Sequence, residues 1–379
     1  MTSLPRRFCP PVLVACVALA SSVLLVPAPA SAETAAGTVL SSTALDPALA
    51  PAGAAESYVV RYSTLRTAEQ AGESTGTVFV PTGDAPADGW PVVSYAHGTT
   101  GVADSCAPSA TGTAQYERPA IEAWLAAGHA VVATDYAGMG TPGVHAYLDG
   151  PAAGANAIDI VRAAHTMLGD RLSPEWITTG LSQGGNTSFF TAAAASTRAP
   201  DLDFRGAVSV AGPTGLDTVL PLVGPVLPPV VPSGFLGYVF YTLAGLADQR
   251  PELDVRQYLT PKGVEYLDAA TTLCGNEFRD YRSAHPAQFG ELLTRPLTPL
   301  APVLEQMQAV PVSGYDRPLL VTQSLSDQTV PAPLTFAHTA RMTAAGTDFQ
   351  LVTFPTPDHI GTLMASMPAS LDFAARVLS

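Results

Sequence analysis

The fold of this chain is decided by one stretch, Trp176-Ile177-Thr178-Thr179-Gly180-Leu181-Ser182-Gln183-Gly184-Gly185. Its first half is rich in β-branched residues, as a strand requires, and small residues that suit a helix follow. The serine and its two glycines match the pattern G-x-S-x-G, in which a tight strand-to-helix turn projects the serine hydroxyl above a sheet. The helix N-terminus behind the serine offers backbone N–H groups to a developing oxyanion. We therefore interpret Ser182 as a candidate nucleophile.

Short apolar runs alternate with helical patterns along most of the chain. After an antiparallel opening pair, 57–62 and 76–81, six further runs are expected as strands, namely 92–95, 130–134, 176–181, 207–212, 318–322 and 349–354. Segments between and after them, such as 154–168 and 363–377, have helical spacing. This alternation predicts an α/β fold with a mostly parallel, eight-stranded sheet and helices on both faces.

The first 32 residues have the pattern of a secretory signal peptide. Arg6 and Arg7 precede an apolar run over 12–26, and Ala30-Ser31-Ala32 offers a small-residue cleavage site. We therefore expect a secreted protein, cleaved near Ala32; a lipoprotein site at Cys16 is the less favoured alternative. From 33 to 55 the sequence has no sustained periodicity, which indicates a loosely ordered lead-in.

The mature chain is acidic and contains two cysteines. Removal of residues 1–32 takes away two arginines and no acidic residue, so the formal net charge moves from −14 to −16. Such a chain lacks the basic surface that nucleic acids require, and we expect no nucleic-acid partner. Cys106 and Cys274 remain, and an even pair in an exported protein indicates one disulfide, with two buried free thiols as the alternative. Their wide spacing does not favour a metal site.

An uncharged stretch interrupts the alternation after the sixth expected strand. No residue from 218 to 247 is charged, and five prolines over 221–232 would disrupt a membrane-spanning helix. We interpret this stretch as part of an apolar cap over the active site. The expected domains are thus a core over 56–212 and 309–379 and a cap insertion over 213–308.

A nucleophilic serine needs a base to accept its proton and an acid to orient that base. On a sheet of this kind the expected chain order is Ser, then Asp or Glu, then His. Asp327 and His359 each follow a predicted strand, so all three side chains should reach the same rim as Ser182. Asp358 is a competing acid, but it adjoins His359 in sequence, and neighbouring residues on an extended loop point apart.

Two backbone N–H groups are needed to hold the oxyanion. One is expected from Gln183, directly after the nucleophile, and the other from Thr99, in the loop after the third strand. Thr100 is the second choice for that loop. His97 and Gly98 come directly before Thr99, and we expect them to support the oxyanion loop, not to act as the base.

Three segments together resemble a known family. They are Tyr95-Ala96-His97-Gly98-Thr99-Thr100-Gly101 followed by Cys106-Ala107-Pro108-Ser109, the turn Asp135-Tyr136-Ala137-Gly138, and Gly180-Leu181-Ser182-Gln183-Gly184-Gly185. The chain is similar in these segments to the secretory lipase family. The resemblance implies an α/β-hydrolase fold with a cap between the sixth and seventh strands, ester hydrolysis through Ser182, Asp327 and His359, and an acyl tunnel formed partly by the cap. It also implies a Cys106–Cys274 disulfide and neither a metal nor an organic cofactor.

These observations predict a secreted serine ester hydrolase, a lipase or carboxylesterase that cleaves acyl esters such as acylglycerols. Its partners would be small-molecule or lipid ester substrates, with transient contact with a lipid interface, and we expect a monomer. A serine peptidase or amidase is the nearest alternative, because an acyl-transfer triad does not choose its own leaving group. A binding protein that retains the fold without catalysis is a more distant one.

Overall fold

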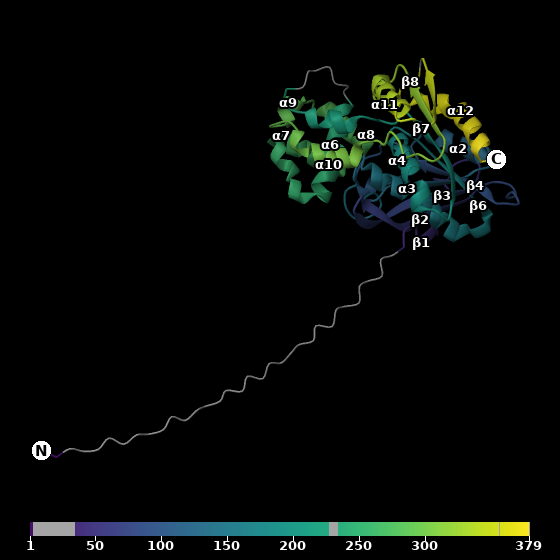
Figure 1. Ribbon diagram of the computed structural model, residues 1–379, viewed down its shortest axis with the longest axis horizontal. Coiled ribbons are helices and arrows are strands. Elements are labelled where there is room, and N and C mark those ends of the chain that lie inside the picture. Colours follow the sequence, from purple (N-terminus) through teal and green to yellow (C-terminus); the bar gives the residue numbers. More distant parts are fainter. Residues whose placement is uncertain (3–34, 227–233, 356, 379) are drawn as a thin grey trace. The chain divides into compact units, whose positions relative to one another are not determined.

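The structure, a computed structural model, describes residues 1–2, 35–226, 234–355 and 357–378. The chain divides into two units, Met1–Thr34 and Ala35–Ser379, and the second contains every strand and helix described below (Figure 1). The predicted signal peptide, 1–32, lies outside the described residues except for Met1 and Thr2. Cleavage near Ala32 therefore stays a prediction.

A nine-stranded sheet forms the centre of the second unit, in the spatial order β1-β2-β3-β5-β4-β6-β7-β8-β9. The strands are β1 (Val39–Ala44), β2 (Ala54–Thr67), β3 (Gln70–Pro81), β4 (Trp90–Ala96), β5 (Ala130–Thr134), β6 (Leu172–Leu181), β7 (Asp203–Val210), β8 (Leu319–Ser324) and β9 (Phe349–Phe354). The pairs from β1 to β5 are antiparallel, and those from β5 through β4 to β9 are parallel. The predicted α/β fold with a mostly parallel sheet is confirmed.

The predicted strand count of eight, and the loose lead-in over 33–55, are wrong at β1. The side chains of β1 are exposed except for half-buried Val39, so the sequence lacks the apolar alternation that marks a half-buried strand. Backbone pairing with β2 holds β1 instead, from Val39 opposite Tyr62 to Ala44 opposite Tyr58. An edge strand of this kind depends on its neighbour's backbone, which a local pattern does not reveal.

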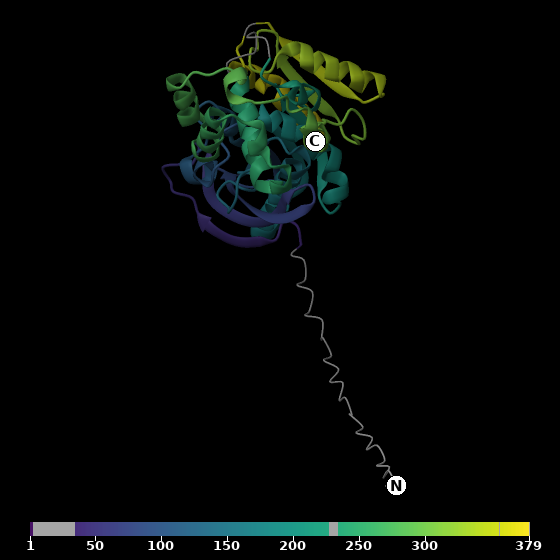
Figure 2. The same ribbon diagram turned by 90° about the vertical axis from the view of Figure 1, so that its left-hand side faces the viewer.

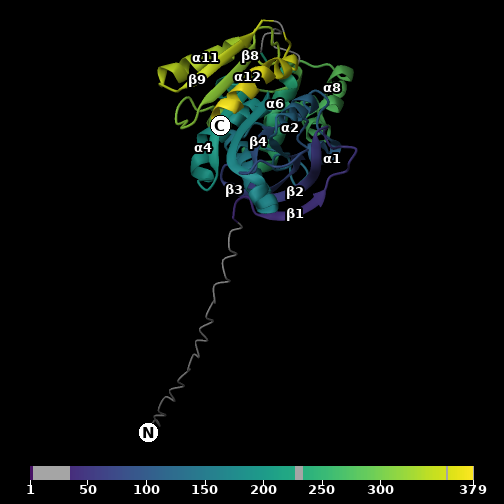
Figure 3. The same ribbon diagram turned by 90° about the vertical axis from the view of Figure 1, so that its right-hand side faces the viewer.

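Helices cover both faces of the sheet. One face carries α3 (Gly150–Leu168), α4 (Gln183–Arg198) and α11 (Ala332–Ala344), and the other carries α2 (Arg118–Ala126) and α12 (Gly361–Val377), which lie on the side seen in Figure 3. Successive strand residues serve opposite faces: Trp176 belongs to the cluster of α3 and α4, whereas Ile177 belongs to that of α2 and α12. Burial on both faces explains why the central strands are continuous apolar runs.

A helical cap lies between β7 and β8 (Figures 1 and 2). Its helices are α5 (Leu216–Val219), α6 (Phe235–Gln249), α7 (Pro261–Thr272), α8 (Gly275–Ala284), α9 (Phe289–Leu292) and α10 (Ala301–Gln308). The cap has a hydrophobic core in which Phe240 of α6 packs against Tyr266 of α7. Because α6 is buried along most of its length, it has no room for charged side chains before its last turn. None of the helices in the described ranges is long and apolar enough to cross a membrane.

Candidate active site

Ser182 lies at a sharp turn between β6 and α4. Its backbone has φ 59° and ψ −117°, a conformation that a non-glycine residue rarely adopts. The Ser182 N–H donates to Val210 O at 2.9 Å, and Asn186 N–H donates to Ser182 O at 2.9 Å, so bonds on both sides hold the turn. A Cβ atom at Gly184 would lie 1.8 Å from Ala96 O. Only glycine at this position lets the start of α4 approach β4 so closely.

Asp327 and His359 form a buried hydrogen-bonded pair. Nδ1 of His359 lies 2.7 Å from Oδ2 of Asp327. The other carboxylate oxygen, Oδ1, accepts the N–H groups of Thr329 and Val330 at 2.8 Å each. With Nδ1 donating to the carboxylate, the basic lone pair of the neutral ring is on Nε2. Asp358, the competing acid, instead accepts the Gly361 N–H at 2.7 Å at the start of α12.

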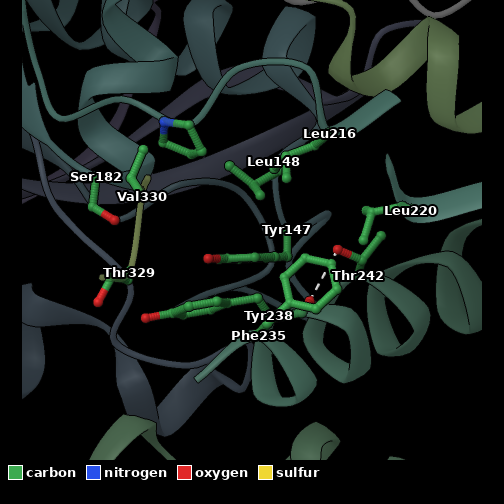
Figure 4. A pocket seen from close by; sticks show the side chains of 11 residues that line it. Tyr147, Leu148, Ser182, Leu216, Leu220, Phe235, Tyr238, Thr242, Thr329 and Val330 are labelled. Carbon is green, nitrogen blue, oxygen red and sulfur yellow. Dashed lines mark hydrogen bonds between the residues drawn. The ribbon is translucent and has the colours of Figure 1, made fainter. Parts of the chain in front are cut away.

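Ser182 and the loop that holds Asp327 meet at one pocket of about 420 Å³ (Figure 4). Thr329 and Val330, whose amides bind Asp327, line this pocket together with Ser182. Among the described residues, neither Oγ of Ser182 nor Nε2 of His359 has a hydrogen-bond partner. The structure thus joins His359 to Asp327, and among the described residues no hydrogen bond joins His359 to Ser182.

The rest of the pocket is uncharged and mostly apolar. Helix α6 contributes three of its side chains, and the other walls come from the segments after β5, β6, β7 and β8, with Leu216 on α5; the lining is Tyr147, Leu148, Ser182, Pro213, Leu216, Leu220, Phe235, Tyr238, Thr242, Thr329 and Val330. The rings of Tyr147 and Tyr238 stack with centroids 6.4 Å apart. The uncharged cap sequence indicated a cap over the site, but it did not reveal which residues face Ser182.

The loop after β4 contains the expected oxyanion donor Thr99 and its two supporting residues. Nδ1 of His97 lies 2.5 Å from Gly98 O, and Tyr136 donates its hydroxyl proton to His97 O at 3.0 Å. Burial lowers the pKa of His97, which favours a neutral ring. The Thr99 hydroxyl shares a hydrogen bond of 2.7 Å with the Tyr147 hydroxyl. His97 is thus enclosed within the loop and is not placed to act as the base.

Gln183 begins α4, so its backbone N–H has no acceptor within the helix. Its side-chain amide donates to Nε2 of His145 at 2.8 Å, and Nδ1 of His145 lies 3.2 Å from Ala137 O. Burial lowers the pKa of His145 to about 3, which keeps the ring neutral and able to accept this bond. No pattern in the sequence indicated this contact between His145 and Gln183.

Cys106 and Cys274 form a disulfide, as the family resemblance implies. Next to it, the Gly275 N–H donates to Thr100 O at 2.7 Å. Cys274 directly precedes α8, so the covalent bond and the hydrogen bond together join the loop after β4 to the cap. Within the described ranges, no group of three or more His, Cys, Asp or Glu side chains is arranged to hold a metal ion.

Removal of this disulfide by the double replacement C106A/C274A is expected to lower the free energy of unfolding by about 5 kcal/mol. The two cysteines are separated by 168 residues, and closing so long a loop restricts the unfolded chain strongly. Urea unfolding followed by tryptophan fluorescence measures the change. Reduced wild-type protein is the control and should match the double variant. A midpoint that reduction leaves unchanged would contradict the prediction.

Comparison with known proteins agrees with this architecture. The family model of the secretory lipases matches residues 104–377. The closed-state structure of Candida antarctica lipase A aligns with a TM-score of 0.73 and 20% identity, over 90% of this chain and 82% of that one. The rice cell wall degrading esterase LipA from Xanthomonas oryzae aligns with a TM-score of 0.71 and 17% identity, over 91% and 99%. No curated protein sequence matches the chain.

At these identities the solved structures establish the fold, and the family model supplies the relationship. Its match begins within the loop that contains Cys106 and ends in the last helix, so it includes the serine turn, the cap and the Asp327–His359 pair. The chain therefore belongs to the secretory lipase family and is a carboxylic ester hydrolase.

Proposed function

We propose that this protein is a secreted serine ester hydrolase that cleaves acyl esters, among them acylglycerols, through an acyl-enzyme intermediate. One observation carries the proposal. Ser182 lines an uncharged pocket beside Thr329 and Val330, whose amides bind the carboxylate that is hydrogen-bonded to His359. A nucleophile, a base and an orienting acid in this relation are the parts that acyl transfer requires.

In the proposed reaction, Ser182 Oγ attacks the ester carbonyl carbon while Nε2 of His359 accepts its proton. Asp327 holds the ring and stabilises the imidazolium that forms. The backbone N–H groups of Thr99 and Gln183 bind the oxyanion of the tetrahedral intermediate. His359 then gives its proton to the leaving alcohol, and Ser182 remains acylated. Water, activated by His359 in the same way, releases the carboxylic acid and restores the serine.

The lining of the pocket favours a substrate with an apolar acyl group over a peptide substrate. All eleven of the described residues that line it are uncharged, whereas a peptidase that recognises a peptide terminus needs an opposite charge to bind it. Leu148, Leu216 and Leu220 provide apolar surface against which an alkyl chain would lose its contact with water. A lipid-like acyl chain is therefore the substrate group that the lining favours.

Secretion and a monomeric state belong to the same proposal. The signal pattern over 1–32 and the disulfide in the mature chain both fit an oxidising extracytoplasmic compartment. Mass spectrometry of the protein from culture medium should find Glu33 as the first residue, and light scattering should give the mass of one chain. A retained N-terminus would contradict cleavage near Ala32.

Two assays on the purified protein test the reaction. A fluorophosphonate probe should label Ser182, and p-nitrophenyl esters should be hydrolysed far faster than matched p-nitroanilides. Comparison of butyrate, octanoate and palmitate esters then gives the preferred chain length. Absence of labelling would indicate a non-catalytic binding protein, and faster turnover of the anilides would indicate a peptidase or amidase.

A further inference from the structure

Glu117 is a buried carboxyl that lies against the oxyanion loop. It directly precedes α2, and its side chain turns inward and is fully buried. Oε1 accepts the Gly98 N–H at 2.8 Å and lies 3.3 Å from the Tyr95 hydroxyl. Oε2 has no hydrogen-bond partner, and no ion pair to Glu117 forms within the described ranges. Burial of a carboxylate without a counter-charge costs folding free energy, so the burial of Glu117 against Gly98 requires an explanation.

The contact with Gly98 bears directly on the Thr99 amide. Glu117 holds the N–H of Gly98, and His97 lies against the carbonyl oxygen of the same residue. That carbonyl shares its peptide plane with the N–H of Thr99, because a peptide unit is planar and trans. Glycine has no Cβ to restrict its rotation. The contacts of Glu117 with the Gly98 N–H and of His97 with the Gly98 carbonyl oxygen therefore determine the direction in which the Thr99 N–H points.

We propose that Glu117 is a positioning residue for ester hydrolysis: its ionised carboxylate holds Gly98 so that the Thr99 N–H faces the oxyanion formed at Ser182. This inference rests on the proposed function, since it takes Ser182 as the nucleophile. A carboxylate accepts a more stable hydrogen bond from an amide than a neutral group does. Protonation of Glu117 weakens the bond to Gly98, and the loop then has a less defined direction for its donor.

The surroundings of Glu117 make its ionisation sensitive to pH. Burial raises its pKa to about 7, against the lowering effect of the bonds from Gly98 and Tyr95. The titratable groups that face it are phenols: Tyr95 of β4, Tyr116 beside it, and Tyr136 after β5, each with a pKa that burial raises. All three stay neutral near pH 7. Of these four groups, Glu117 is therefore the one that changes charge as the pH falls through neutrality.

The raised pKa of Glu117 also means that the ionised carboxylate, which the proposed role requires, destabilises the folded state. Because the pKa of Glu117 is raised on folding, the folded chain binds this proton more strongly than the unfolded chain. Its contribution to stability is present below pH 4.5 and is lost as the pH rises through about 7. The ionised form that the oxyanion loop needs is thus the form that costs the folded state most.

The replacement Glu117→Gln tests the proposal because it keeps the size and one acceptor oxygen but does not titrate. With p-nitrophenyl butyrate above neutral pH we expect kcat about fivefold lower and KM unchanged, since charge-assisted hydrogen bonds are roughly twice as strong as neutral ones. In wild type, protonation of Glu117 should remove the same factor, so the ratio of wild-type to E117Q kcat should fall from about five to about one as the pH falls through about 7.

Two further variants complete the experiment. Glu117→Leu removes the acceptor altogether, and kcat should fall about 100-fold, as for loss of one oxyanion donor. Glu122→Gln is the matched control: Glu122 lies on α2, is half-buried, and accepts hydrogen bonds from Arg118 and the Ala52 N–H, away from the loop. It should leave both kcat and the pH dependence of kcat unchanged. If E117L does not fold, E117Q alone decides.

A kcat of E117Q within twofold of wild type at every pH would overturn the role of Glu117. That result is distinct from failure of the proposed function. In the latter case the fluorophosphonate probe would leave wild-type protein unlabelled, whereas here labelling of Ser182 would persist and only the effect of Glu117 would be missing.

Discussion

Replacement of Ser182 by alanine is expected to reduce kcat for p-nitrophenyl butyrate by about 10⁶-fold, the size of loss seen when a serine nucleophile is removed elsewhere. Alanine has no hydroxyl to form the acyl-enzyme. The donors at Thr99 and Gln183 remain and account for the residual rate over water. The melting temperature should stay close to that of wild type, because the change removes one oxygen that has no partner among the described residues.

Ser188→Ala is the matched control for this experiment. Ser188 lies on α4 and is buried like Ser182, though more completely, but its hydroxyl donates to Gly184 O at 2.9 Å and is not part of the pocket lining. S188A should keep wild-type kcat. If S182A retained a substantial fraction of wild-type turnover, the covalent route through Ser182 would be excluded.

Asp327→Asn is expected to lower kcat by about 10⁴-fold, the loss measured for the equivalent change in a serine protease. The reason lies in the two amides of Thr329 and Val330, which donate to Oδ1 of Asp327. An asparagine would keep its oxygen at these donors and turn its NH₂ group toward His359. Nδ1 must then accept a hydrogen bond from that NH₂ group, so the ring proton lies on Nε2. The atom that should accept the serine proton is no longer basic.

Asp358→Asn distinguishes this effect from a general change of charge beside His359. Asp358 accepts the Gly361 N–H at the start of α12, and asparagine can accept the same bond. We expect D358N to keep kcat within a few-fold of wild type across the same pH range. Equal losses in the two variants would show that the orienting acid is not specifically Asp327.

The sequence predicts those features that depend on neighbours in the chain. The strand-turn-helix around Ser182 follows from β-branched residues, glycines and small residues in immediate succession. Asp327 and His359 follow from the ends of two parallel strands, because such ends share one edge of a sheet. The edge strand β1 was missed, since its side chains are exposed and its position depends on pairing with β2.

The tertiary structure decided which polar groups are buried and what they contact. Glu117 has a sequence context that resembles a solvated helix start, yet it lies under Gly98, 19 residues away. The sequence favours Asp327 over Asp358 only because neighbouring side chains on an extended loop point apart. The structure shows His359 hydrogen-bonded to Asp327, 32 residues away in the chain. The contact of Gln183 with His145, and the identity of the α6 residues that line the pocket, likewise depend on the tertiary structure. Local patterns establish strands, helices and turns, because backbone geometry repeats over a few residues. Partners of a buried polar group are set by segments that meet only after the chain has folded.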